Sequence, residues 1–262
     1  MNFDFAGKVA VVTGGGKGIG RAIAVEFARA GATSVLAART VPALEETAAI
    51  IRGFGGKALC VPIDLCDSSA VRHLFERTRQ ELGRLDVLVN NSGIEGPTAP
   101  VTEITDEQWD QVMNVNVRGV FLCCRAAVPM LKESRGCIIN LSSLGGGLRA
   151  YPNRLPYATS KAADVAIARS LGVELAAFGI RVNAICPGPV AGDRFESVVR
   201  NRARVQKKTP EAVREWIIDQ SPLHHVTDPR EVAECALWLA SDAAKSVTAQ
   251  HINLTCGVEW AP

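Results

Sequence analysis

This sequence of 262 residues lacks the patterns that identify several common classes of protein. Its eight cysteines form no CxxC pair and its four histidines no HExxH spacing, so we predict reduced cysteines in the core and no metal site. No apolar run approaches the length that a bilayer requires, and the first residues carry no basic-then-apolar signal pattern. We therefore expect a cytoplasmic protein that does not bind a membrane.

The sequence also lacks an excess of charge of either sign. Lysine and arginine number 29 against 27 for aspartate and glutamate, and a formal net charge of +2 argues against nucleic acid or a membrane as the main partner. The apolar fraction of 47% is ordinary for a soluble globular protein. Because parallel α/β sheets of this length can form one hydrophobic core, we expect a single domain over residues 1–262.

Apolar runs alternate with helical patterns along the chain. The apolar run of residues 9–12 is followed by the glycine-rich turn of residues 13–20 and then by a helical pattern. A buried parallel strand is continuously apolar, and glycines after it let the backbone approach a diphosphate at the N-terminus of the next helix. Further strands are expected at residues 34–38, 57–63, within 86–93, and at 137–141, 180–185 and 250–254. The alternation predicts an α/β fold that binds a nucleotide.

The end of the second predicted strand has no acidic residue. Dinucleotide folds place there the carboxylate that binds the ribose 2′-hydroxyl of NAD, whereas this chain has Ala38 followed by Arg39. Arg39 and Lys17 could surround a 2′-phosphate, to which a guanidinium is well matched. We therefore predict NADP(H) in preference to NAD(H), with a solvated loop charge as the alternative for Arg39. Asp64, at the next strand end, either meets the adenine rim or forms a turn.

One asparagine is out of place in a predicted helix. A capping box at residues 105–108 should begin a long helix that continues through Asn116 to about Met130. Asparagine is a poor residue for a helix interior because its amide competes for backbone groups. Such local inconsistencies tend to be functional or to shape a kink.

Residues 157–161 place a tyrosine and a lysine one helical turn apart. Pro156 favours a helix start, and the alanine-rich stretch after it favours helix, so Tyr157 and Lys161 should share a face. An ammonium beside a phenol favours the phenolate, and such a tyrosine can exchange a proton with an alcohol or a carbonyl. The pair by itself is a common coincidence, and its surroundings decide its meaning.

Residues 192–222 interrupt the alternation and are expected to form a substrate lid. Between residues 193 and 215 there are seven lysines and arginines against four acidic residues. This net charge of +3 could bind an anionic substrate or form a solvated helix face. Arg149 and Arg154, which flank Tyr157 in the sequence, are better placed than most of these cations for an anionic substrate.

These motifs, taken in order, resemble the short-chain dehydrogenase/reductase family over essentially the whole chain, in particular members that act as 3-oxoacyl-carrier-protein reductases. The resemblance implies a Rossmann-type, doubly wound, seven-stranded parallel sheet with helices on both faces. It implies an oxidoreductase that transfers a hydride between a nicotinamide cofactor and a carbonyl or secondary alcohol. It also implies a homo-oligomer, a tetramer or a dimer, formed through the helices at residues 106–130 and 156–178.

The resemblance assigns roles to individual residues. Tyr157 resembles the general acid/base, Lys161 the residue that holds the nicotinamide ribose, and Ser143 the hydroxyl that steadies the substrate oxygen. Asn116 resembles the helix-kinking residue whose backbone holds a water for a proton relay. The expected cofactor-binding residues are Gly14, Gly16, Lys17, Gly18, Ile19, Gly20, Arg39, Asp64, Leu65, Asn90, Ser92, Gly93, Tyr157, Lys161, Pro187, Gly188 and Val190.

Two alternative functions remain open. One is an NAD-dependent alcohol or sugar dehydrogenase of the same family. The other is a catalytically silent regulator that senses the cofactor, against which the complete set of Asn116, Ser143, Tyr157 and Lys161 argues. The chain also departs from the family at Gly192, where a threonine often contacts the nicotinamide amide, so that contact is either lost or supplied by backbone.

Overall fold

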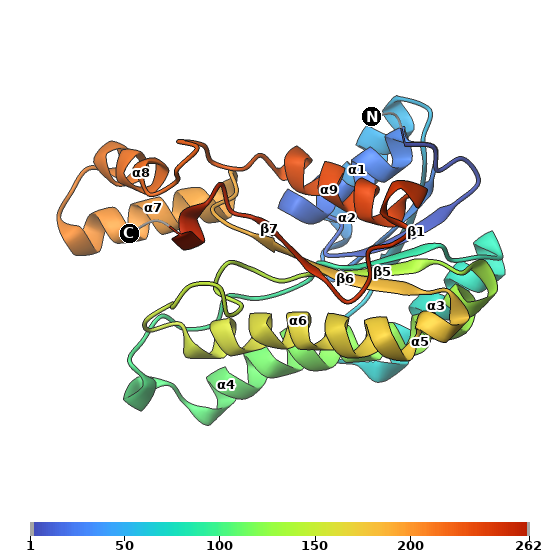
Figure 1. The fold of residues 1–262 in the computed structure, drawn as a ribbon, viewed down its shortest axis with the longest axis horizontal. Helices are drawn as coiled ribbons and strands as arrows, with labels where there is room; N and C mark the ends of the chain where they lie inside the picture. Colours follow the sequence, from blue (N-terminus) through green and yellow to red (C-terminus); the bar gives the residue numbers. More distant parts are fainter. Residues whose placement is uncertain (1–2, 261–262) are drawn as a thin grey trace.

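A computed structural model describes residues 3–260 and places one parallel sheet between two helical layers (Figure 1). Within these residues the sheet has seven strands, paired in parallel in the order β3-β2-β1-β4-β5-β6-β7. The strands are β1 (Val9–Thr13), β2 (Thr33–Ala38), β3 (Lys57–Pro62), β4 (Val87–Asn90), β5 (Cys137–Leu141), β6 (Arg181–Pro187) and β7 (His251–Leu254). The order reverses between β1 and β4, and such switch points open a ligand crevice at the carboxyl ends of the strands. The predicted doubly wound Rossmann-type fold is confirmed.

Helices cover both faces of the sheet. One layer contains α1 (Gly18–Arg29), α2 (Val41–Gly53) and α9 (Pro229–Ala240). The other contains α3 (Ser68–Leu82), α4 (Asp106–Met113), α5 (Gly119–Ser134) and α6 (Leu155–Glu174). Every residue of β1, β4 and β5 is buried, as expected for strands covered on both faces. Each fully buried Leu, Ile or Phe contributes roughly 1.5–3 kcal/mol, so the two apolar layers hold the sheet rigid.

The two helices of the segment at residues 192–222 project from one end of the sheet (Figure 1). They are α7 (Asp193–Gln206) and α8 (Pro210–Asp219), and α8 starts where the sequence predicts, with Thr209 accepting a hydrogen bond from Ala212 N. The pair has a small apolar core of its own, formed by Phe195, Val199, Ala203, Val213 and Ile217. Because α7 follows β6 after a short loop, the projecting unit lies at the carboxyl ends of the strands.

The helix predicted over residues 106–130 is present but not uniform. A capping box at Thr105 starts it, and a π-helical turn at Asn114–Arg118 separates α4 from α5. Asn116 therefore lies in an irregular turn of the helix, as expected from an asparagine in a helix interior. Short 3₁₀ turns occur at Val101–Glu103, Ala176–Phe178, Asp242–Ala244 and Val258–Trp260.

Three further features bear on function. No helix of the described part of the chain is long and apolar enough to cross a bilayer. Among residues 3–260, no three His, Cys, Asp or Glu side chains are grouped to hold a metal ion. The eight cysteines are free thiols, and Cys66 is exposed, unlike the core position expected for it, because it sits in the loop after β3.

Candidate active site

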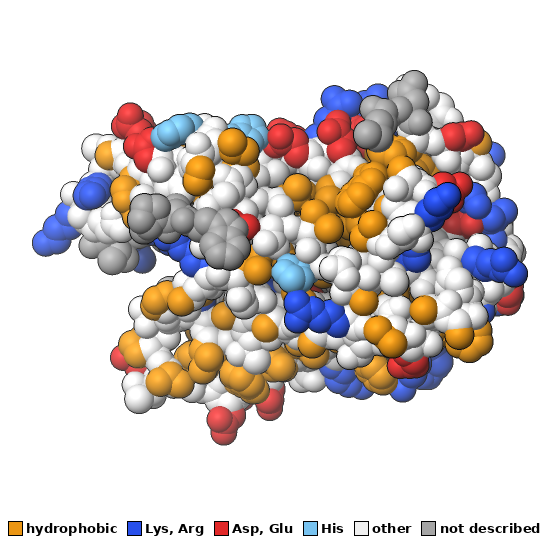
Figure 2. All heavy atoms as spheres, viewed as in Figure 1, with side chains coloured by type: hydrophobic (Ala, Val, Ile, Leu, Met, Phe, Trp, Pro, Cys, Tyr) orange, Lys and Arg blue, Asp and Glu red, His pale blue; other side chains and the backbone are white. Residues whose placement is uncertain are grey.

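A cavity of about 990 Å³ opens at the carboxyl ends of the central strands. Its volume is at the upper end of the range for ligand pockets. The space-filling view shows the molecule hollowed between the projecting α7–α8 unit and the helical layer below it (Figure 2). The cavity begins at the turn after β1 and extends to α7, so a long ligand could reach from one to the other.

The turn after β1 is built for close approach of a ligand. Gly14 and Gly18 have φ of 68° and 50°, and a Cβ on Gly20 would overlap the Gly14 carbonyl oxygen. The first turn of α1 has no acidic residue, and Lys17 at its N-cap makes no side-chain cap. The backbone N–H groups there are thus available to an anionic group. Gly20 itself packs behind the wall and does not line the cavity.

Hydrogen bonds join the loops after β1 and β4 across the switch point. Thr13 Oγ1 accepts from Asn91 N at 3.0 Å and from Ser92 N at 3.1 Å, while Asn91 Nδ2 donates to Thr13 O at 2.9 Å. Asn91, Ser92 and Gly93 line the cavity. Asn90 does not: it is buried and donates to Asn140 Oδ1 at 3.0 Å. Asn91, which was not among the expected cofactor residues, lines the cavity instead.

The far wall near β2 and β3 is cationic. Lys17, Arg39 and Leu65 line it, with no acidic side chain at Ala38. Asp64 also lines the cavity, but its Oδ1 accepts from Cys66 N at 2.9 Å, which is the turn-forming role. Ile19, Gly16, Pro187, Gly188 and Val190 complete the expected residues that line the cavity.

Asn116 lies behind the wall and organises it. Its Oδ1 accepts from Ile94 N at 2.8 Å, and its Nδ2 donates to Ile94 O and to Ser160 Oγ, each at 2.9 Å. The side chain therefore supplies hydrogen-bond partners to both backbone groups of Ile94 and connects the loop after β4 to α6. This amide is fully buried and does not face the cavity.

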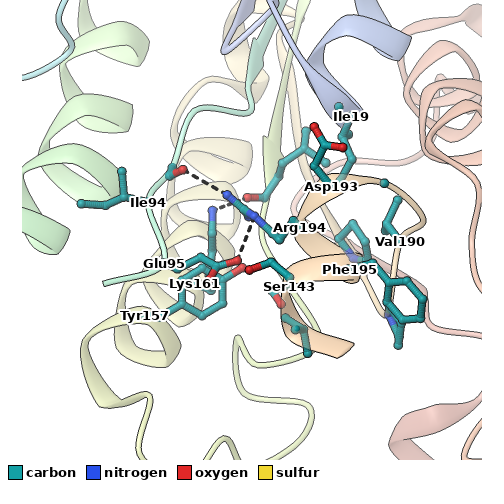
Figure 3. Close-up of a pocket in the computed structure, with 18 of the residues that line it drawn as sticks. Ile19, Ile94, Glu95, Ser143, Tyr157, Lys161, Val190, Asp193, Arg194 and Phe195 are labelled. Atoms are coloured by element: carbon teal, nitrogen blue, oxygen red, sulfur yellow. Dashed lines mark hydrogen bonds and ion pairs between the residues drawn. The ribbon is translucent and has the colours of Figure 1, made fainter. Parts of the chain in front are cut away.

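Ser143, Tyr157 and Lys161 converge on the cavity (Figure 3). Ser143 follows β5, and the other two lie on α6, which begins at a proline-containing first turn as expected. The neighbouring Ser142 donates its hydroxyl to Lys161 O at 2.6 Å, so its proton is committed to structure. The Ser143 hydroxyl, which accepts from Gly145 N at 3.3 Å, keeps its own proton free to donate into the cavity.

Lys161 is paired with a carboxylate that sequence reasoning missed. Its Nζ donates to Leu141 O at 2.6 Å and to Asp164 Oδ2 at 2.9 Å. Burial raises the pKa of Asp164 to about 6, even though Lys161 acts to lower it. The signal was present in the sequence, because residues three apart on a helix share a face.

A second missed residue, Glu95, links three elements over the cavity. Its carboxylate lies 3.6 Å from Arg154 at the start of α6 and 3.0 Å from Arg194 at the start of α7. Arg194 also donates to Gly93 O at 3.4 Å, so the start of α7 is held to the loop after β4 (Figure 3). The Arg154 guanidinium lies 5.2 Å from the centre of the Tyr157 ring.

Gly192, the N-cap of α7, has a backbone conformation that a threonine would not adopt. Its φ of 129° and ψ of −175° belong to a region that is essentially restricted to glycine. The departure from the family at this position is therefore matched by local backbone geometry.

Comparison with known proteins gives consistent matches over the chain. The family model described as "Enoyl-(Acyl carrier protein) reductase" matches residues 14–259. The 3-oxoacyl-[acyl-carrier-protein] reductase FabG of Thermotoga maritima is 36% identical over 253 residues, covering 96% of this chain and 98% of that protein. A 3beta-hydroxysteroid dehydrogenase of Mediterraneibacter gnavus is 34% identical over 268 residues, 95% of each chain.

Three solved structures share the fold closely. Levodione reductase has a TM-score of 0.92 at 31% identity and covers 98% of this chain and 100% of its own. NAD⁺-bound xylitol dehydrogenase has a TM-score of 0.91 at 30% identity, with 97% and 99% covered. A single-substitution variant of actinorhodin polyketide ketoreductase with NADPH has a TM-score of 0.91 at 32% identity, with 96% and 97% covered.

Proposed function

Because the chain belongs to the short-chain dehydrogenase/reductase family and is an oxidoreductase of that family, we propose that it interconverts a carbonyl and a secondary alcohol with NADP(H). The observation that carries the proposal is the convergence of Ser143, Tyr157 and Lys161 on one cavity that also contains the glycine turn. The sequence similarity to a 3-oxoacyl-[acyl-carrier-protein] reductase and to a 3beta-hydroxysteroid dehydrogenase supports the reaction class.

The cavity wall fits a dinucleotide. The uncapped N-terminus of α1 suits a diphosphate, and the glycines at residues 14–20 leave the space that side chains would fill. When bound, a nicotinamide cofactor supplies or accepts the hydride. We propose that the residues holding it include Gly14, Gly16, Lys17, Gly18, Ile19, Arg39, Asp64, Leu65, Asn91, Ser92, Gly93, Tyr157, Lys161, Pro187, Gly188 and Val190. Gly20 and Asn90 support this wall from behind.

The charge near β2 favours NADP(H). Lys17 and Arg39 line that end, where an acidic residue would select NAD(H). Among the similar structures, one is a ketoreductase with NADPH and one a xylitol dehydrogenase with NAD⁺. An NAD-dependent alcohol or sugar dehydrogenase is thus the alternative, and the two cations argue against it.

The reaction chemistry falls to three side chains. Tyr157 donates its proton to the carbonyl oxygen during reduction and accepts one from the alcohol during oxidation. Ser143 donates a hydrogen bond to the same oxygen, which stabilises the charge that develops there. Lys161 lies one helical turn after Tyr157 on α6 and lines the same cavity, where its ammonium would hold the cofactor. We propose that α7 and α8 close over the substrate end and limit the access of water.

An anionic substrate is supported by the arginines at the substrate end. Arg154 is only 19% exposed and, within residues 3–260, its Nε is buried without a hydrogen-bond partner. Arg149, Arg194 and Arg202 line the same end. In contrast Arg200, Arg204, Lys207 and Lys208 are exposed outside the lining, so they form a solvated face. We propose that Arg154 binds a carboxylate or similar group of the substrate.

The proposal is tested by the variant Tyr157→Phe. The control is Tyr151→Phe, because Tyr151 is the only other tyrosine of the sequence and lines the same cavity. NADPH consumption is followed over paired neutral and carboxylate-bearing ketones. Loss of general acid catalysis should lower kcat/KM by about 100-fold or more in Tyr157→Phe, with little change in Tyr151→Phe. The carboxylate-bearing ketones should react faster.

Unchanged turnover in Tyr157→Phe would contradict the assigned chemistry. Cofactor binding without turnover on any ketone or alcohol would instead favour the silent regulator. Equal turnover of neutral and anionic ketones would remove the substrate proposal and leave the reaction class intact.

A further inference from the structure

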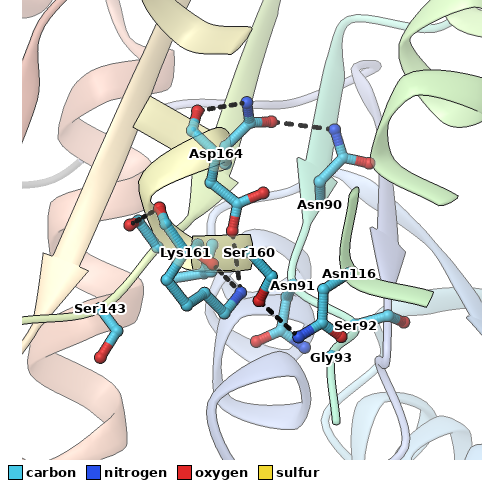
Figure 4. A network of polar contacts seen from close by, with 12 residues as sticks. Asn90, Asn91, Ser92, Gly93, Asn116, Ser143, Ser160, Lys161 and Asp164 are labelled. Carbon is cyan, nitrogen blue, oxygen red and sulfur yellow. Dashed lines mark hydrogen bonds and ion pairs between the residues drawn. The ribbon is translucent and has the colours of Figure 1, made fainter. Parts of the chain in front are cut away.

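Asp164 is a buried carboxylate that the proposed reaction leaves without a role. It lies on α6 three residues after Lys161, and its side chain is 1% exposed. Its Oδ2 is 2.9 Å from Lys161 Nζ, which is itself buried beside the cavity (Figure 4). A buried ion pair is costly to form and more costly to break, so this one constrains Lys161 strongly.

The polar groups around Asp164 hold its backbone and leave its carboxylate to Lys161. Asn140 Nδ2 donates to the main-chain oxygen of Asp164 at 3.2 Å, and Asn90 Nδ2 donates to Asn140 Oδ1 (Figure 4). Within residues 3–260, Asp164 Oδ1 is buried with no hydrogen-bond partner. The charge of the carboxylate is therefore balanced by a single group, the Lys161 ammonium.

Lys161 has limited capacity for a new partner. Its ammonium has three N–H donors, of which Leu141 O and Asp164 Oδ2 take two. The remaining donor lies near the cavity wall, where a Cβ on Gly93 would be 3.5 Å from Nζ. A ligand of the cavity that needs more than one of these donors competes directly with Asp164.

We propose that Asp164 is a positioning residue that holds the Lys161 ammonium before a nicotinamide nucleotide binds and takes up a proton when the nucleotide engages Lys161. This inference rests on the proposed function, because it assumes that Lys161 contacts the nucleotide. The proton passes from solvent to an Asp164 carboxylate oxygen, and the hydrogen bond from Lys161 to that carboxylate is given up. The carboxylate becomes neutral because an unpaired buried charge is unstable.

The electrostatic surroundings agree with this exchange. Burial raises the pKa of Asp164 to about 6 and Lys161 opposes it, so weakening the ion pair raises the pKa further. Burial by itself lowers the pKa of Lys161, but Asp164 and Tyr157 raise it more, and Arg194 opposes them. The thiols that face Asp164 are Cys124 of α5, whose pKa burial raises to about 12, and Cys186 of β6, whose pKa burial also raises. Both thiols stay neutral near pH 6.

The sign of the effect follows from linkage. A group whose pKa is higher in the complex takes up protons on binding, so affinity rises as the pH falls toward about 6. An increase of about one pKa unit tightens the Kd roughly fivefold between about pH 8 and about pH 6, and the effect approaches about tenfold only at lower pH.

The experiment is calorimetric titration of the whole protein with NADH and NADPH, in buffers of different ionisation enthalpy near pH 6.5. NADH is the decisive probe because it lacks the 2′-phosphate, which titrates in the same range. The wild type should take up a substantial fraction of a proton per site, and Asp164→Asn should take up much less. The control is Asp86→Asn, since Asp86 is a buried carboxylate paired with Arg84 at the amino end of β4, outside the cavity lining.

Each outcome of this titration either supports or overturns the proposal. Uptake in the wild type and in Asp86→Asn, but not in Asp164→Asn, supports the proposal. Binding with no proton uptake in the wild type, or with equal uptake in Asp164→Asn, overturns it and leaves the proposed function standing. If Asp164→Asn does not fold, Lys161→Met replaces it and should abolish the same uptake. If neither nucleotide binds the wild type, the proposed function fails and this inference fails with it.

Discussion

Neighbouring residues of one type have different tasks at this site. The Ser142 hydroxyl donates to the Lys161 carbonyl, whereas the Ser143 hydroxyl stays in the cavity. Asn90 bonds inside the core, whereas Asn91 bridges two loops in the cavity wall. Successive residues at a strand end point in different directions, so one serves packing and the next faces the ligand.

At the residue scale, Arg39 should set the cofactor preference. Arg39→Ala removes a guanidinium that lines the cavity beyond β2, and we expect the Kd of NADPH to rise about tenfold while that of NADH changes little. Fluorescence titration with both nucleotides measures this. The matched control is Arg52→Ala, an exposed arginine in the last turn of α2 that lies outside the cavity. An equal loss for the two nucleotides would argue against a 2′-phosphate contact.

At the scale of elements, the π-helical turn at Asn114–Arg118 connects the loop after β4 to α6. Its extra residue turns Asn116 inward, where one amide satisfies both backbone groups of Ile94 and the hydroxyl of Ser160. A regular helix would not carry an asparagine here without a cost, and the hydrogen bonds offset that cost.

Asn116→Ala should therefore destabilise the fold as well as the site. It removes the partner of both backbone groups of Ile94 and leaves the Ser160 hydroxyl only its hydrogen bond to Tyr157 O, so we expect a loss of about 2–4 kcal/mol in the free energy of unfolding. Urea denaturation measures it. Asn114→Ala is the control, because Asn114 occupies the same turn and is exposed. A loss of similar size in both variants would mean that the turn, and not the buried amide, matters.

At the scale of the whole molecule, α5 and α6 present exposed apolar side chains on the outer face of their layer. Phe121 is 50% exposed and Val173 is 74% exposed. Ala162 and Ala166 precede Val173 at helical spacing along the exposed side of α6, and such small side chains allow close helix packing. We therefore predict that this face takes part in the homo-oligomer, a tetramer or a dimer, that the family resemblance implies.

Val173→Glu should weaken that assembly. A buried glutamate without a partner is strongly unfavourable at an interface, so we expect a smaller species than in the wild type. Light scattering coupled to size-exclusion chromatography gives the mass. Leu223→Glu is the control, because Leu223 is 72% exposed in the segment between α8 and α9. A monomeric wild type, or an unchanged assembly in Val173→Glu, would contradict the prediction.

Local patterns in the sequence were sufficient for the fold and the family. Apolar runs, glycine turns and caps at Thr105 and Asp228 depend on residues close in the chain, and the predicted strands and helices are present with small shifts at their ends. The family membership and the oxidoreductase class are also confirmed. The Tyr157 and Lys161 pair was readable because four residues make about one helical turn.

Only the tertiary structure decided which polar groups meet. Glu95 joins Arg154 and Arg194, which are 59 and 99 positions further along the chain, and no local pattern encodes such a contact. Asn91 lines the wall and Asn90 does not, because successive side chains at the end of β4 point in different directions. Asp164 gained its importance from burial, which a sequence position does not reveal. By itself the sequence determined the elements and predicted the reacting residues, while packing between distant segments determined which charged groups surround those residues.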